Sequence, residues 1–286
     1  MGIADICKNA LIIALGTVYT SQLALAEQYN AMSFFKRVPM SISDEGRKKL
    51  GETSAGDIPV LVRISEAISG FSYDDLAADG SDLVFGEMKD DDSIVVYPHE
   101  IEMWNRDGVS LVWVKVPVLS ASTKFAMFYG NGVEVENTAK DVWVNYRGVW
   151  HLKETDGDAE DATGNGLKAV PTGANKEDSV GVADCAVGFG RQMASEKGRK
   201  SYLSVANDDL LDCGNSLTFS GWFKAHNAYA NFSMRYVSRK EKYDGSDGWE
   251  VEALYVDSAD KSATTVSARG ASGDNAKTTI PDVRNN

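Results

Sequence analysis

The chain has 286 residues, of which 43% are hydrophobic and 25% charged, and its formal net charge is −13. This length exceeds one average domain, and the composition is that of a globular protein with a sizeable core. Because binding to phosphates needs clustered Lys and Arg, the acidic balance argues against a nucleic-acid partner. A solvated acidic surface is the simpler interpretation of the charge, and binding of divalent cations is the alternative.

Residues 1–26 have the pattern of a cleaved signal peptide. Lys8 precedes a short apolar run over Ala10–Val18, and Ala24-Leu25-Ala26 is a small-x-small cleavage pattern. The run is shorter than the roughly 20 residues needed to span a bilayer, so we expect no transmembrane segment in the mature chain. The pattern therefore predicts an exported protein, which is periplasmic, at the cell surface or secreted.

Two cysteines, Cys185 and Cys213, remain after removal of residues 1–26. An even number in an exported chain permits a disulfide. Two separate buried thiols are the alternative, and the sequence separation does not decide between them because the Cα separation does.

In the first part of the chain, from Glu27 to Lys140, apolar and polar residues alternate with period two. Turn signals such as Asp79-Gly80 and Asn131-Gly132 separate the runs, and a long apolar repeat of period 3.6 is absent. This pattern is typical of an antiparallel sandwich or barrel. The predicted strands are Phe34–Ser43, Ile58–Ile64, Leu83–Phe85, Ile94–Tyr97, His99–Trp104, Leu111–Val118 and Lys124–Tyr129.

The stretch from Asp141 to Glu154, DVWVNYRGVWHLKE, joins this series to a second one. We place a domain boundary between residues 144 and 145, and we expect Val149–Leu152 to be the first strand of the second domain. The connection is short and flanked by Trp143 and Trp150, which predicts a packed, rigid interface between the domains.

The second series, residues 145–286, also has the β pattern, with an Asp- and Gly-rich loop near its start. We expect the last strong strand at Thr264–Ala268 and a poorly ordered or incomplete sheet beyond about Gly270, where hydrophobic side chains become sparse. The other predicted elements are an apolar stretch over Gly181–Phe189, strands over Tyr202–Val205, Leu217–Phe223, Arg235–Arg239 and Trp249–Val256, and a turn over Asp208–Asp212.

Four segments follow one another in the first series, and they are SDLVFGE, YPHEIEMW, VWVKVPVL and FAMFYGNG. On these segments the series resembles the family called domain of unknown function 2341, and the resemblance covers Ile58 to about Gly132. Phe128 stands where the family has the first Tyr of its Y-Y-G-N turn. Some relatives are fused to TolQ/ExbB-type proton-channel subunits, so the resemblance implies a role at the cell envelope.

The second series resembles a laminin-G-like, concanavalin A-like jelly roll. The segments that carry this likeness are VWHLKE, DATGNG, VGFG, YLSVANDDLLD and SLTFSGWFKA. A W-H-H strand and an L-Y-V-x-G turn, usual in that family, are missing after Gly270, so the jelly roll is expected to be incomplete at its C-terminal end. The fold is used chiefly to recognise carbohydrates or proteins, although a fold alone does not fix function.

Catalytic groups are sparse in the sequence. None of the histidines, His99, His151 and His226, lies in a nucleophile-elbow context or has the spacing of a zinc site. We interpret His151 as a packed, hydrogen-bonded core residue rather than a base. We expect His99 and His226, which lie next to turns, to be exposed. Glu100 and Glu102 share one face of a predicted strand with Trp104. They could act as a glycosidase pair, but a solvated outer sheet face is the favoured interpretation.

Two kinds of binding site remain as candidates. Asp156, Asp158 and Asp161 offer oxygen ligands for calcium in one loop, with a solvated acidic turn as the alternative. Glycan recognition uses aromatic faces together with amides and carboxylates. Its candidate residues lie in or beside turns of the second domain, and they are Trp222, Tyr229, Tyr243 and Trp249.

We therefore expect an all-β protein with two antiparallel β-sandwich domains in tandem, residues 27–144 and 145–286. The expected role is non-catalytic binding in the cell envelope or outside the cell, with a glycan as the favoured ligand. The first alternative is a structural or assembly module that docks on an envelope protein complex such as a TolQ/ExbB-type transport system. A glycoside-active enzyme is the weaker alternative.

Overall fold

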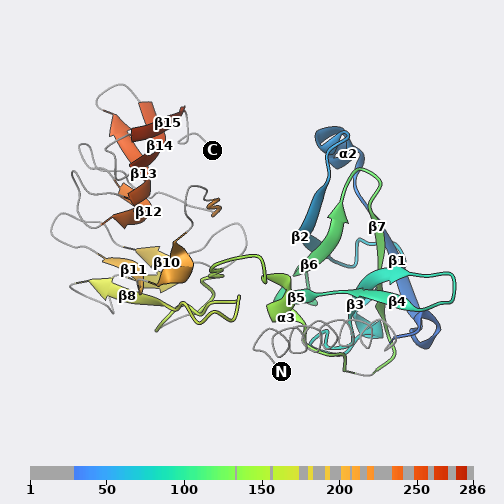
Figure 1. The fold of residues 1–286 in the computed structure, drawn as a ribbon. Coiled ribbons are helices and arrows are strands. Elements are labelled where there is room, and N and C mark those ends of the chain that lie inside the picture. Colours follow the sequence, from blue (N-terminus) through green and yellow to red (C-terminus); the bar gives the residue numbers. More distant parts are fainter. Residues whose placement is uncertain are drawn as a thin grey trace, which may run out of the picture. The chain divides into compact units, whose positions relative to one another are not determined.

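The protein is mostly antiparallel β-sheet with few helices, as predicted (Figure 1). The computed structural model describes residues 29–132, 134–154, 157–173, 180–182, 191–193, 201–206, 208–212, 218–221, 234–240, 248–256, 261–269 and 275–281. The chain divides into two compact units, one formed by residues up to Val170 with Ser204–Leu211, the other by Pro171–Leu203 with Asp212–Asn286. The boundary expected after residue 144 therefore falls inside the first unit.

Two antiparallel sheets form the sandwich of the first unit, with the strand orders β1-β7-β3-β4 and β2-β6-β5. Pro98 alone separates β4 from β5, so the chain crosses from one sheet to the other at this residue. All seven strands were predicted, with shifts of at most a few residues at their ends. Their bounds are β1 Lys36–Ser41, β2 Ala55–Ile64, β3 Val84–Met88, β4 Ile94–Tyr97, β5 His99–Met103, β6 Ser110–Leu119 and β7 Lys124–Tyr129.

The core between these sheets follows from the period-two alternation of the strands. Phe125, Met127 and Tyr129 of β7 face this core, together with buried residues of both sheets. The intervening Ala126 and Phe128 face a second, smaller cluster that includes Ala31 and Phe34. The segment before β1 therefore covers the outer face of the four-stranded sheet, which explains why β7 is buried on both sides.

The helices of the first unit are short. The 3₁₀ helices are η1 Ala31–Ser33, η2 Tyr73–Asp75 and η3 Asp209–Leu211, and the α-helices are α2 Asp44–Leu50 and α3 Ala139–Val142. In α2, the side chain of Ser43 accepts a hydrogen bond from the Gly46 amide, and acidic residues precede basic ones. This order complements the helix dipole and stabilises the charged segment as a short helix.

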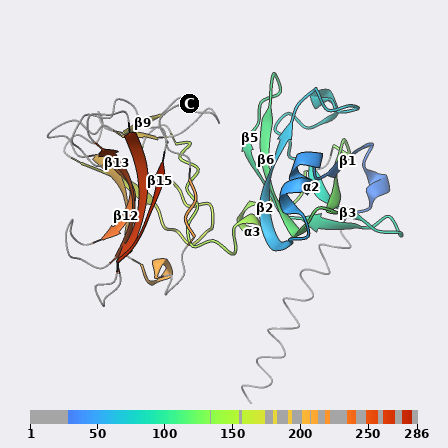
Figure 2. The same cartoon turned by 90° about the horizontal axis from the view of Figure 1, so that it is seen from above.

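Strands also make up the second unit. β12 Met234–Lys240, β13 Gly248–Val256, β14 Lys261–Arg269 and β15 Asn275–Pro281 form an antiparallel sheet in chain order (Figure 1), and Figure 2 shows the same sheet after a turn of 90°. Ala263 to Arg269 of β14 pair with Pro281 to Asn275 of β15. The last strong strand was expected at Thr264–Ala268, with a poorly ordered or incomplete sheet beyond about Gly270. β15 instead continues the sheet, because the β-branched run Thr278-Thr279-Ile280 favours a strand.

Four short strands, β8 to β11, form two further pairs. β9 Val180–Val182 pairs with β10 Arg191–Met193, and β8 Ala169–Gly173 pairs with β11 Ser201–Val205. β11 agrees with the prediction. Within the predicted strand Leu217–Phe223, the described residues 218–221 are not in a strand. The jelly-roll topology expected for this part of the chain stays a prediction.

Candidate functional site

The candidate site lies on the outer face of the three-stranded sheet, where β5 presents two carboxylates. Opposite β5, Glu100 pairs with Trp113 of β6, and Ile101 pairs with Val112. The register then shifts, so that Glu102 is the extra residue of a β-bulge before Met103. A bulge redirects the side chains that follow it without ending the strand, so Glu100 and Glu102 share one face by ordinary alternation and the phase changes only after Glu102.

The same bulge corrects one detail of the predicted alternation. Trp104 was expected to share a face with Glu100 and Glu102, but the extra residue reverses the phase after Glu102. The Trp104 ring packs against the core between the sheets, edge-on to Tyr73, and its Nε1 donates to the Ala78 carbonyl at 2.9 Å.

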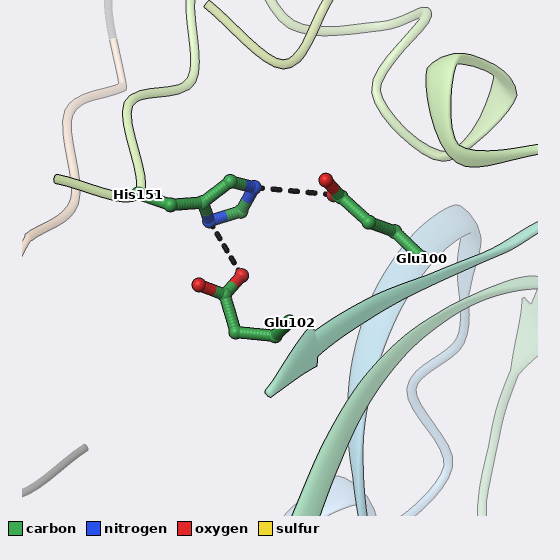
Figure 3. A group of neighbouring side chains, drawn as sticks. All are labelled: Glu100, Glu102 and His151. Carbon is green, nitrogen blue, oxygen red and sulfur yellow. Dashed lines mark hydrogen bonds and ion pairs between the residues drawn. The ribbon is translucent and has the colours of Figure 1, made fainter. Parts of the chain in front are cut away.

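His151 lies between the two carboxylates (Figure 3). Its Nε2 is 3.1 Å from Oε2 of Glu100, and its Nδ1 is 2.6 Å from Oε2 of Glu102. The side chain of His151 is 11% exposed, that of Glu100 13% and that of Glu102 5%. We call this group the Glu100–His151–Glu102 cluster. Glu100 and Glu102 were expected on a solvated sheet face, and that expectation was wrong because the segment carrying His151 covers them.

Two tryptophans hold the carboxylates from the other side. Nε1 of Trp143 donates to Oε2 of Glu100, and Nε1 of Trp113 donates to Oε2 of Glu102 at 2.9 Å. The Trp143 ring is in edge-on contact with Trp113, Tyr146 and His151, at centroid distances of 5.4, 5.2 and 5.6 Å. Each Oε2 therefore has one indole partner and one imidazole partner, which fixes the direction in which each carboxylate points.

In the cluster, the charged forms of His151 and of the two carboxylates stabilise one another. Burial disfavours a charged His151, but the hydrogen bonds and charges of Glu100 and Glu102 outweigh it and raise the pKa of His151 to about 9. Burial likewise opposes ionisation of Glu100, yet the contacts with His151 and Trp143 leave the pKa of Glu100 below its ordinary value. At neutral pH, His151 is therefore an imidazolium that donates a hydrogen bond to each carboxylate.

The position of His151 depends on the loop that follows it. Asp161 accepts hydrogen bonds from the amides of Val149, Thr163 and Leu167 and from the Thr163 hydroxyl. Nε1 of Trp150 also donates to the Leu167 carbonyl at 2.6 Å. These bonds hold residues 149–167 in a fixed loop. Val149–Leu152 was predicted as a strand, which was wrong, because its neighbours are loop amides rather than a second strand.

Of the predicted calcium ligands, the structure describes Asp158 and Asp161, so the calcium site stays a prediction. The carboxylate of Asp161 is occupied by amide and hydroxyl donors of its own loop. Among the residues that the structure describes, the side chains close enough to share a metal ion are Glu100, Glu102 and His151, whose ligand atoms all lie within 4.8 Å of one another. Asp158 does not belong to this group, and Asp156 lies outside the described residues.

Most other predicted site residues also lie outside the described part of the chain. These are Trp222, Tyr229, Tyr243 and His226, together with the cysteines Cys185 and Cys213. Trp249 is in β13, where its backbone pairs with Arg239 of β12 and Ala268 of β14. The glycan site and the disulfide therefore stay predictions.

His99, on the other hand, is described. Burial lowers the pKa of His99 to about 4, against a weaker opposing effect of a hydrogen bond with the Tyr97 backbone. Its ring packs edge-on against Phe85 at 5.2 Å. The sequence predicted an exposed histidine next to a turn, which was wrong, because β5 directs the ring toward the other sheet.

Reasoning from the sequence treated His151 and the two glutamates separately and so missed their association. It did anticipate that His151 would be packed and hydrogen-bonded, which is confirmed. The signal that could have joined them is the pair Glu100 and Glu102 on a strand otherwise rich in apolar residues, because buried carboxylates require a partner.

The fold and this site define an all-β protein whose first unit carries a buried carboxylate–imidazole cluster on a sheet face. Comparison with protein-family models, curated proteins and solved structures gave no match. The resemblance to the domain of unknown function 2341 and to the jelly roll therefore stays a prediction. Within the described residues, the helices are too short or too polar to cross a membrane.

Proposed function

We propose that the protein is an exported, non-catalytic binding protein of the cell envelope or extracellular space, and that its ligand is a carbohydrate. The sequence resemblances and the acidic composition support this class of protein. The non-catalytic part of this proposal is supported by the burial and the hydrogen bonds of Glu100 and Glu102. Both carboxylates are buried and are hydrogen-bonded to His151 and to an indole.

A glycosidase is disfavoured by the same observation. Its two carboxylates must face a cleft in which one protonates the leaving group while the other attacks or activates water. Glu100 and Glu102 instead face a histidine of the same chain, and the side chain of Glu102 is only 5% exposed. We infer that this pair holds the fold together rather than cleaving a sugar.

The carbohydrate proposal can be tested on a glycan array with the full chain. We expect saturable binding to at least one saccharide and a loss of affinity of about tenfold or more in Trp222→Ala or Trp249→Ala, because a stacked aromatic anchor dominates such sites. The matched control is Tyr202→Ala, which removes an aromatic side chain that is 50% exposed and is not among the predicted binding residues. A folded chain that binds no saccharide would refute the proposal.

The second candidate function is docking on an envelope protein complex such as a TolQ/ExbB-type transport system. It is favoured by two large apolar side chains on the segment before β1, Met32 and Phe35, which are 77% and 85% exposed. Exposed apolar groups close together are typical of interaction surfaces. We expect co-purification with such a subunit from envelope extracts, reduced severalfold by Phe35→Ser. Equal recovery with Val144→Ser, a substitution at a 57% exposed position elsewhere, would serve as the control.

A further inference from the structure

We propose that Glu100, Glu102 and His151 form a binding site for a first-row divalent cation, with Zn²⁺ as the favoured ion. The proposal rests on the convergence of three ligand side chains and on a buried carboxylate oxygen that has no partner. It is independent of the carbohydrate proposal, because no residue of the predicted glycan site takes part.

The first argument is the geometry of the ligand atoms. Zinc binds imidazole nitrogen and carboxylate oxygen at about 2.0–2.2 Å, so two ligands of one tetrahedral ion lie roughly 3.3 Å apart. Each ring nitrogen of His151 faces one carboxylate, with Nε2 3.1 Å from Glu100 and Nδ1 2.6 Å from Glu102. One ion would take one of these nitrogens, and the ligand atoms that the three residues offer lie within 4.8 Å of one another, so the side chains would turn toward that nitrogen to close around the ion.

A second, independent observation is the remaining oxygen of Glu102. The Glu102 side chain is 5% exposed, and its Oε1 is buried without a hydrogen-bond partner. An unsatisfied buried carboxylate oxygen is costly and rare. Oε2 is already shared between Trp113 and His151, so Oε1 is the free lone-pair site of this carboxylate. A cation bound to it would remove the deficit.

The surroundings supply the outer contacts that a metal site needs. Carboxylate ligands are usually oriented by further hydrogen bonds, which are important for affinity. Trp143 and Trp113 provide one such bond each, to Glu100 and to Glu102, and both tryptophans lie on the same sheet face as the cluster. The indole N–H groups would stay in place when the ion is bound.

Charge and ligand type identify the class of ion. Two carboxylates and a neutral imidazole balance the charge of a divalent cation. A nitrogen ligand disfavours Ca²⁺ and Mg²⁺, which prefer oxygen alone. Imidazole together with carboxylates suits Zn²⁺ and its neighbours in the first transition row. Bound zinc would tie the loop carrying His151 to β5.

The test is titration calorimetry of the full chain with ZnCl₂ after removal of metals by a chelator. We expect one ion per chain with a Kd in the micromolar range or below, and a Tm that rises with zinc concentration. Glu102→Gln and His151→Gln should each weaken binding at least tenfold. Asp158→Asn, which removes a carboxylate outside the group, should leave the Kd unchanged. CaCl₂ should give no comparable heat.

Because a variant of a buried residue can fail to fold, a second measurement uses the natural chain alone. Co²⁺ in place of Zn²⁺ should give the visible absorption of a four- or five-coordinate ion and should shift the NMR signals of His151. Absence of saturable Zn²⁺ binding to the folded natural chain would overturn the proposal. So would binding that persists unchanged in both folded variants, or a Co²⁺ complex that leaves the His151 signals unmoved.

Discussion

Replacement of Trp143 by alanine is expected to lower the free energy of unfolding of the first unit by about 3–5 kcal/mol. The side chain is 4% exposed, and its ring contacts Trp113, Tyr146 and His151. The substitution leaves a cavity and also removes the indole N–H that Glu100 accepts. Both effects act on the same sheet face, so the loss exceeds that of a typical buried residue.

Urea unfolding followed by circular dichroism measures this effect without relying on the fluorescence of the deleted residue. Trp143→Phe separates the two contributions, since it keeps most of the ring and removes the N–H. We expect it to cost about 1–3 kcal/mol, the usual range for leaving a buried acceptor without its donor. The matched control is Val144→Ala, at the neighbouring 57% exposed position, which should change stability little. A loss below 1 kcal/mol in Trp143→Ala would contradict the assigned packing role.

The first sandwich could be predicted from the sequence because its signals are local. Each strand alternates with period two, and turn residues such as Asn131-Gly132 mark where strands end. The prediction of Lys124–Tyr129 and Ile94–Tyr97 agrees with β7 and β4 at both ends. What alternation could not reveal is that Ala126 and Phe128 of β7 are also buried, since the segment that covers them is distant in sequence.

The Glu100–His151–Glu102 cluster could not be predicted because it joins residues that are 51 and 49 positions apart, so local patterns carry no information about the contact. The bulge at Glu102 could not be predicted either, and it changes the sheet face that each following residue occupies. Period-two reasoning assumes a constant phase and therefore placed Trp104 beside the glutamates.

In the second unit, the sequence predicted less strand than the structure has. The sparse apolar residues after Gly270 indicate a poorly ordered or incomplete sheet, but β15 pairs with β14 over seven residues. Edge strands need few apolar side chains, because one neighbour supplies their backbone hydrogen bonds. β-branched residues such as Thr278 and Thr279 are enough to favour the extended backbone.

The second large prediction concerns pH. In chelator-treated protein, the stability of the first unit is expected to be greatest near pH 6.5, because its two described histidines are shifted in opposite directions. The pKa of His151 is about 9 in the folded chain, above its ordinary value of 6.5, so its contribution is complete below pH 6.5 and is lost as the pH rises through 9. A shift of this size corresponds to about 3 kcal/mol.

On the acid side, His99 has the opposite effect. Its folded pKa of about 4 lies below the ordinary value of 6.5, so the unfolded chain binds more protons between these values and stability falls as the pH drops through this interval. The lowered pKa of Glu100 adds to the acid loss, since its contribution is present above its ordinary value of 4.5 and disappears as the pH falls through the folded pKa. These two groups together limit stability below pH 6.5.

Urea unfolding from pH 4 to pH 9, followed by tryptophan fluorescence, measures how the free energy of unfolding falls on the acid and on the alkaline side of pH 6.5. Four of the six tryptophans, Trp104, Trp113, Trp143 and Trp150, lie in the first unit and report mainly on it. His151→Gln should flatten the loss above pH 6.5 and should also remove the part of the acid loss that comes from Glu100, because His151 lowers the pKa of Glu100. His99→Phe should reduce the acid loss while leaving the loss above pH 6.5 unchanged, so it is the control for the alkaline effect of His151. Stability that still rises between pH 6.5 and 9 in the natural chain would show that His151 is not held as an imidazolium between Glu100 and Glu102.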